Sequence, residues 1–257
     1  MGRNNSSELR VRPLGEYLLK NKADVDKLLH LVGCSRVCFG MFDDGKVFFS
    51  AKDQDGHSRS ELGLEPSAEH LKGIINFFEK KADENDREYA RKYVGKSKDS
   101  HTKSEREKWF ENCRSEDAFN ALDRGETWPV FEGKTRPDLI IEGERYVIII
   151  EGKLTEKETT KKTVYLRSRD QMVRHIQGAL NHFKGKKIIA FYIVPEGFKE
   201  LGLLKERTCI NEVLEVEADK YGISLESCEK IRKSYYGCTT WEKVEKTLKI
   251  SFPEVIK

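Results

Sequence analysis

Long hydrophobic runs are absent from this sequence, and their absence excludes one class of protein. The longest uninterrupted apolar run, Ile188 to Val194, has seven residues, whereas a helix that spans a membrane needs about 20. The first residues, Met1 to Pro13, are polar and contain no apolar segment of the kind that a secretory signal carries. We therefore expect a cytoplasmic protein that makes no use of a membrane.

Cysteine pairs of the kind that bind metal or form disulfide frameworks are absent. The six cysteines form no CxxC pair and match no disulfide framework, so we expect reduced thiols. A phosphate-binding P-loop, a dinucleotide-binding GxGxxG fingerprint and a GxSxG nucleophile motif are absent as well. The sequence therefore contains no motif for nucleotide binding of these kinds or for hydrolysis by a serine nucleophile.

Charge is almost balanced over the chain but unevenly distributed along it. The 257 residues include 47 Lys and Arg and 44 Asp and Glu, a net charge of +3. Residues 153–187 alone carry ten basic and three acidic side chains, so this stretch has a charge of +7 and the remainder −4. A basic stretch can attract a polyanion such as nucleic acid, and a solvated charged helix is the alternative.

The first 100 residues are expected to form an α+β region of their own. Apolar periodicity predicts a helix within 9–33 and another over 67–93. Between them, alternating apolar residues around Asp44-Gly45 predict a β-hairpin over 36–52, because this dipeptide favours the positive φ angles of a two-residue turn. Residues 95–104 contain no apolar side chain, and we place a boundary there.

Residues 104–257 are expected to form a mixed α/β core with a helical C-terminal extension. The elements expected in the core, 104–195, are a helix after Ser104, strands over 127–131, 138–142 and 145–153, a helix over 169–184 and a strand over 187–194. This αβββαβ order indicates a central sheet covered by helices. Beyond Pro195 we expect helices near 211–221 and after Thr239 or Thr240.

Three charged residues stand at the ends of two adjacent predicted strands. Asp138 begins one strand, and Glu151 and Lys153 end the next. Glu151 directly follows Ile148-Ile149-Ile150, where both faces of the sheet are expected to be buried, and a polar group there needs a partner or a function. The alternative is an ordinary solvated sheet edge.

The length of the connecting loop decides whether these residues meet. If Gly143 and Glu144 form a two-residue loop, Asp138 lies opposite Ile149. Side chains of a strand repeat every two residues, so Glu151 and Lys153 would then share a face with Asp138. Two carboxylates can hold Mg²⁺ through oxygen, and a nearby ammonium can stabilise charge on a phosphate. The arrangement suits metal-assisted hydrolysis of a phosphodiester bond.

These residues resemble the motif of the PD-(D/E)xK nuclease superfamily, which has the restriction-endonuclease-like fold. Pro137-Asp138 matches its first element and Glu151-Gly152-Lys153 its second. The resemblance covers roughly residues 104–195 and implies that Asp138 and Glu151 bind Mg²⁺, with Mn²⁺ as a possible substitute. It also implies that Lys153 acts near the attacking water, on DNA more often than on RNA.

The resemblance adds further candidate residues, each with an alternative. It implies a third acidic catalytic and metal-binding residue at Glu116, on the helix before the first core strand; a helix N-terminal acid is the alternative. Gln171 would face the site, or would form a capping box with Ser168. The candidate phosphate contacts are Arg167, Arg169, Arg174 and His175, because Arg matches phosphate oxygens; solvent-exposed polar residues are the alternative.

We therefore expect a Mg²⁺-dependent DNA endonuclease. The resemblance associates such enzymes with prokaryotic restriction or anti-phage defence, although a fold alone does not determine function. Cutting both strands often takes two active sites, which is compatible with a homodimer. The alternatives are a non-catalytic module that binds nucleic acid or protein on the same scaffold, and a nuclease that acts on RNA or in repair.

Overall fold

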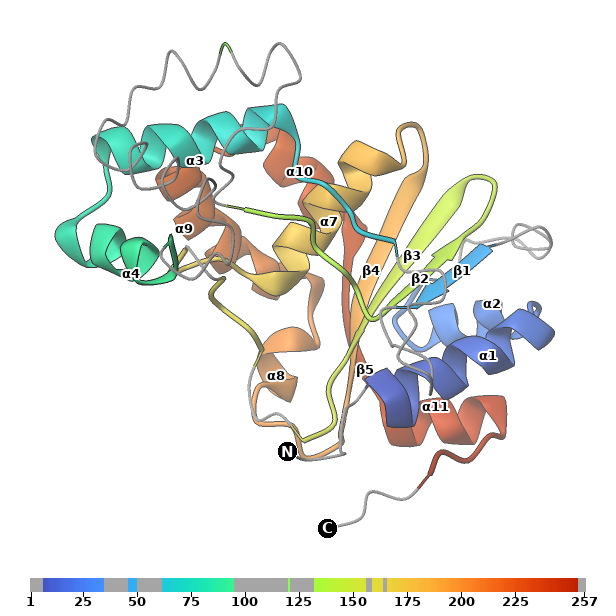
Figure 1. Ribbon diagram of the computed structural model, residues 1–257. Helices are drawn as coiled ribbons and strands as arrows, with labels where there is room; N and C mark the ends of the chain where they lie inside the picture. The colour runs from blue at the N-terminus through green and yellow to red at the C-terminus, as the bar shows by residue number, and fades with distance from the viewer. Residues whose placement is uncertain are drawn as a thin grey trace.

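The computed structural model describes residues 7–34, 46–49, 62–94, 120, 132–155, 159–163 and 166–253. Several expectations lie outside these residues: the first strand of the predicted hairpin, the boundary at 95–104, the helix after Ser104, Glu116 and the strand over 127–131. The described residues form a five-stranded sheet with helices on both faces (Figure 1). The predicted mixed α/β class is confirmed.

The sheet is mixed, and its strands follow one another in chain order. They are β1 (Lys46–Phe49), β2 (Leu139–Glu142), β3 (Tyr146–Gly152), β4 (Lys187–Val194) and β5 (Tyr235–Thr240). β1, β2 and β3 pair antiparallel, whereas β3, β4 and β5 pair parallel. The parallel strands β3 and β4 read as continuous apolar runs because both of their faces are buried.

The register between β2 and β3 differs from the prediction by two residues. Glu142 pairs with Val147, and the N–H of Gly143 donates to the carbonyl of Tyr146 at 2.9 Å, so the loop residues are Glu144-Arg145. The expected Gly143-Glu144 loop was wrong. A shift of two residues leaves every side chain on the same face of the sheet. Asp138, Glu151 and Lys153 therefore still share a face. If the observed register is continued by one residue, Asp138 lies opposite Glu151 rather than Ile149.

One face of the sheet is covered by elements from the two ends of the chain. A π-helical turn (Ser7–Val11) leads into α1 (Arg12–Lys20), which is followed by α2 (Asp24–His30). The helix predicted within 9–33 is therefore interrupted at residues 21–23. Helix α11 (Trp241–Leu248) packs beside α2 on the same face (Figure 1). Gly152 of β3 lies in this layer, where a Cβ atom would overlap Val11 and contact Trp241.

The opposite face carries helix α7 (Gln171–His182) with α9 (Ile210–Tyr221) and α10 (Leu225–Ser234). Helix α7 connects the parallel strands β3 and β4, as a parallel pair requires. The helix predicted over 169–184 is confirmed, and its apolar side chains Met172, Val173, Ile176 and Ala179 are buried against the sheet. The short helix α8 (Leu201–Leu204) lies between β4 and α9.

The described N-terminal residues share the sheet and its cores with the rest of the structure. Strand β1 pairs with β2, and α3 (Ala68–Lys80) packs against α9 (Figure 1). Helix α4 (Glu84–Val94) follows α3, so the helix predicted over 67–93 is two helices. No helix among the described residues is long and apolar enough to cross a membrane.

The close packing of α3 on α9 depends on Gly73. A Cβ atom at this position would overlap the main-chain carbonyl oxygen of Tyr221 at the end of α9. We expect Gly73→Ala to lower the free energy of unfolding by about 1–3 kcal/mol through overpacking, although alanine favours a helix by about 1 kcal/mol. Urea denaturation measures the change.

The matched control is Gly202→Ala in α8, where nothing lies within 4 Å of the added methyl group. This variant should be neutral or slightly stabilising. Equal effects at Gly73 and Gly202 would show that the approach of α9 is looser than described.

Candidate functional site

The candidate site lies where β2 begins and β3 ends. Asp138 stands immediately before β2 and is half-buried, and its Oδ2 accepts a hydrogen bond from the N–H of Gly152 at 2.9 Å. Glu151 is the last acidic residue of β3 and Lys153 follows that strand. Glu151 is 4% exposed and Lys153 5%. The three predicted residues therefore lie together, on the face of the sheet that α7 covers.

Gln171 links the two charged side chains. Lys153 Nζ donates to Glu151 Oε1 at 3.1 Å and to Gln171 Oε1 at 3.0 Å. The amide nitrogen of Gln171 donates in turn to Glu151 Oε1 at 2.7 Å. The three side chains form a closed hydrogen-bonded triangle, in which every contact pairs a donor with an acceptor.

The start of α7 places Gln171 in this triangle. The helix is capped by Asp170, whose carboxylate accepts from the N–H groups of Met172 and Val173. Gln171 is therefore the first residue of the helix rather than a capping residue. The alternative in which Ser168 and Gln171 form a capping box was wrong, and the prediction that Gln171 faces the site is consistent with its contacts.

His175 belongs to the same network. It lies one turn after Gln171 on α7, is 2% exposed, and its Nε2 is 3.1 Å from Glu151 Oε2. Its Nδ1 is 2.6 Å from the hydroxyl oxygen of Thr135. The expectation of an exposed phosphate-contacting residue was wrong, because the ring is buried between Thr135 and Glu151. Thr135 was missed in the sequence, where an isolated threonine in a loop gives no signal.

Glu151 is held in its ionised form by these neighbours. Burial raises the pKa of its carboxyl group, but the hydrogen bonds from His175 and Lys153 and the positive charge of Lys153 outweigh burial, so the pKa lies below its usual range. An ionised carboxylate only accepts hydrogen bonds. The carboxylate therefore has the charge that a metal ligand needs.

The main chain at Lys153 is fixed from both sides. Its N–H donates to the carbonyl of Ile193 in β4 at 2.9 Å, and its carbonyl accepts from the indole Nε1 of Trp241 at 2.6 Å. Hydrogen bonds to β4 and α11 therefore fix the position of the chain at the end of β3. The C-terminal helix, expected only as an extension, supports the candidate site directly.

The oxygen donors at this strand end suit a hard divalent cation. Asp138 and Glu151 present two carboxylates across neighbouring strands, where directly opposed Cβ atoms are about 5 Å apart. Among the residues that the structure describes, no group of three or more His, Cys, Asp and Glu side chains could hold a metal ion. Mg²⁺ commonly uses one or two carboxylates and completes its shell with water and phosphate, so two carboxylates are compatible with it.

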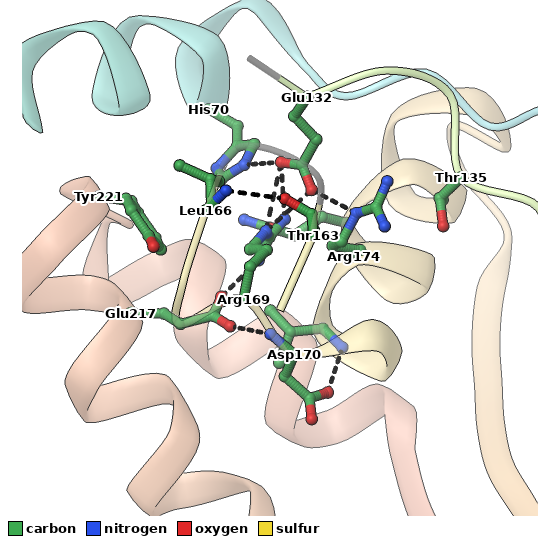
Figure 2. Close-up of polar contacts among 12 residues, drawn as sticks. His70, Glu132, Thr135, Thr163, Leu166, Arg169, Asp170, Arg174, Glu217 and Tyr221 are labelled. Carbon is green, nitrogen blue, oxygen red and sulfur yellow. Dashed lines mark hydrogen bonds and ion pairs between the residues drawn. The ribbon is translucent and has the colours of Figure 1, made fainter. Parts of the chain in front are cut away.

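Arg169 forms a buried ionic cluster beside the site (Figure 2). Its guanidinium lies between Glu132 (Nε–Oε1, 2.9 Å) and Glu217, and the residue is 1% exposed. Arg174 forms an ion pair with Glu132 at 2.5 Å, and His70 hydrogen-bonds to the same carboxylate. The prediction that Arg169 contacts phosphate was wrong. Its guanidinium is bound by carboxylates in the interior and does not reach the surface.

Acidic residues outside 153–187 form ion pairs with most of the described basic side chains in this stretch. Arg167 lies 3.5 Å from Asp86 of α4 and 3.7 Å from Asp83. Of the nine basic residues in 153–187 that the structure describes, six form ion pairs with acids outside 153–187: Lys153, Lys161, Arg167, Arg169, Arg174 and Lys186. The local charge of +7 is therefore largely compensated in the fold.

No protein-family model, curated protein or solved structure matches this chain. The geometry around Glu151 and the motif at the two strand ends are thus the basis for a functional proposal. Glu116, the third expected acid, lies outside the described residues.

The ionic cluster should make stability depend on pH. Burial raises the pKa of Glu217 to about 7, despite its contact with Arg169. The folded protein therefore binds this proton more tightly than the unfolded chain, whose ordinary value is 4.5. The contribution is fully present below pH 4.5 and is lost as the pH rises to about 7.

We expect Glu217→Gln, which stays neutral, to gain stability relative to the wild type between pH 4.5 and 8, by up to about 3 kcal/mol. Urea unfolding at several pH values measures the difference. Glu215→Gln, on the exposed side of the same helix, is the matched control and should show no such trend. A difference that does not change with pH would contradict the raised pKa.

Proposed function

We propose that this protein is a Mg²⁺-dependent nuclease with a restriction-endonuclease-like core. The observation that carries the proposal is the cluster of Asp138, Glu151, Lys153 and Gln171 at the ends of two neighbouring strands. An ionised carboxylate and a lysine buried side by side next to a second carboxylate are costly to maintain. Perturbed, paired groups of this kind are concentrated in functional sites.

Each side chain has a role that its position supports. Asp138 and Glu151 would hold the divalent cation through their carboxylate oxygens. The chemistry that this cation supplies when bound is polarisation of the phosphate and easier deprotonation of the attacking water. Lys153 would stabilise the negative charge that develops on the phosphate. Gln171 would hold the side chains of Lys153 and Glu151 in their relative positions, because it hydrogen-bonds to both.

Access to the site supports a substrate that approaches from the strand ends. Asp138 and Gln171 are partly exposed, whereas Glu151 and Lys153 are buried. We propose DNA as the substrate and endonucleolytic cutting as the reaction, on the strength of the motif resemblance. A role in prokaryotic defence, a cytoplasmic location and a homodimer belong to the same proposal.

A non-catalytic binding module on this scaffold is the second candidate. The observation that favours it is the closed hydrogen-bonding of the network, in which Glu151 already has three donors within the chain. The compensation of the basic stretch by remote acids favours it too, since it reduces the surface charge that nucleic acid would meet.

Cleavage assays separate the two candidates. Purified protein is incubated with supercoiled plasmid, linear DNA, single-stranded DNA and RNA, in Mg²⁺, Mn²⁺ or EDTA. We expect cleavage that requires metal and falls at least ~100-fold in Asp138→Asn and in Lys153→Met. The asparagine amide keeps an acceptor for the N–H of Gly152, and the methionine side chain keeps nearly the length of lysine. Both changes therefore remove charge with little change in shape.

The matched control is Asp219→Asn, at an exposed aspartate on α9 far in sequence from the motif. This variant should cut at the wild-type rate. Folding of each variant is checked by its circular dichroism spectrum. Absence of cleavage on every substrate, together with nucleic-acid binding that persists in EDTA, would reject the nuclease proposal in favour of the binding module.

A further inference from the structure

We infer that Thr135 and His175 are positioning residues that set the orientation of the Glu151 carboxylate. This inference rests on the proposed function, because it concerns how the metal ligand Glu151 is held. It adds two residues that the motif does not contain. Both are buried, with Thr135 6% and His175 2% exposed.

The hydrogen bonds of His175 have a defined direction. Nε2 lies 3.1 Å from Glu151 Oε2, and a carboxylate oxygen only accepts, so Nε2 carries the hydrogen. In the neutral ring Nδ1 is then the acceptor. The hydroxyl group of Thr135, 2.6 Å away, donates to it. The chain of donation therefore runs from Thr135 through His175 to Glu151: the carboxylate selects the Nε2–H tautomer, and the hydroxyl of Thr135 holds the ring at Nδ1.

This chain determines how the two oxygens of Glu151 are used. Oε1 accepts from Lys153 and Gln171, whereas Oε2 accepts from His175. Without His175, Oε2 would lose that donor, and the carboxylate could turn about its last side-chain bond. The orientation of a carboxylate ligand toward a cation is set by such outer hydrogen bonds.

The main chain holds Thr135 rigidly in place. Its N–H and C=O groups exchange hydrogen bonds with those of Leu64, each at 2.9 Å. This bridge approaches α7 at Gly178, where a Cβ atom would lie 2.8 Å from Leu64 Cβ and 3.3 Å from Thr135 Cγ2. Gly178 is three residues after His175, so the absence of its side chain allows Thr135 to reach the imidazole ring. The segment before α3 thereby contributes to the site.

The test compares paired variants. Thr135→Val removes the hydroxyl and Thr135→Ser keeps it. His175→Asn is too short to reach Glu151, whereas His175→Gln can place an amide N–H near the position of Nε2. We expect Thr135→Val and His175→Asn to bind Mn²⁺ about 10–100-fold more weakly by calorimetry. kcat for DNA cleavage should fall with little change in KM, and the Ser and Gln variants should recover most of both.

Imidazole ¹⁵N NMR of the metal-free protein provides a readout independent of activity. The wild type should show His175 as the Nε2–H tautomer, and Thr135→Val should shift the Nδ1 resonance. The opposite tautomer would overturn the inference.

Asp138→Asn distinguishes the failure of this inference from that of the proposed function. Loss of metal binding in Asp138→Asn, with wild-type values in Thr135→Val and His175→Asn, would overturn the positioning role and leave the nuclease proposal intact. A wild type that neither binds Mn²⁺ nor cuts nucleic acid would overturn both.

Discussion

A carboxylate buried at the end of a central strand must find its hydrogen-bond donors inside the protein, and much of this fold can be understood from how Glu151 finds them. Lys153 comes from the same strand end, whereas Gln171 and His175 come from one face of α7. The side chains on α7 reach Glu151 because this helix, which connects β3 to β4, packs against both strands. The sheet register and the start of α7 therefore both determine whether the charge can be buried.

The sequence allowed prediction of those features that depend on local periodicity. The bounds of β4 agree with the prediction, and the shared face of Asp138, Glu151 and Lys153 was correct despite a register error, because strand side chains alternate with a period of two. Strand β5 was not predicted, because Tyr235–Thr240 contains no sustained apolar run and gains its place by pairing with β4.

Errors arose where several residues of the same chemical type competed for one role. Ser168 and Asp170 are both good capping residues, and only the observed start of α7 identifies Asp170 as the cap.

The partners of Arg169 lie 37 and 48 residues away in the chain. No local pattern predicts such pairs, so several basic residues that looked available to nucleic acid instead form ion pairs with remote acids. Local charge in a sequence is thus a weak guide to the charge of a surface.

The hydrogen bond from Trp241 to the carbonyl of Lys153 has a consequence for how the protein is made. The two residues are 88 positions apart, and ribosomes add about 5–20 residues per second. The strand end that carries Lys153 therefore waits roughly 4–18 s during synthesis before its partner in α11 exists. A nascent chain cannot complete this site until α11 has been translated, so the finished arrangement forms only after synthesis has passed Trp241.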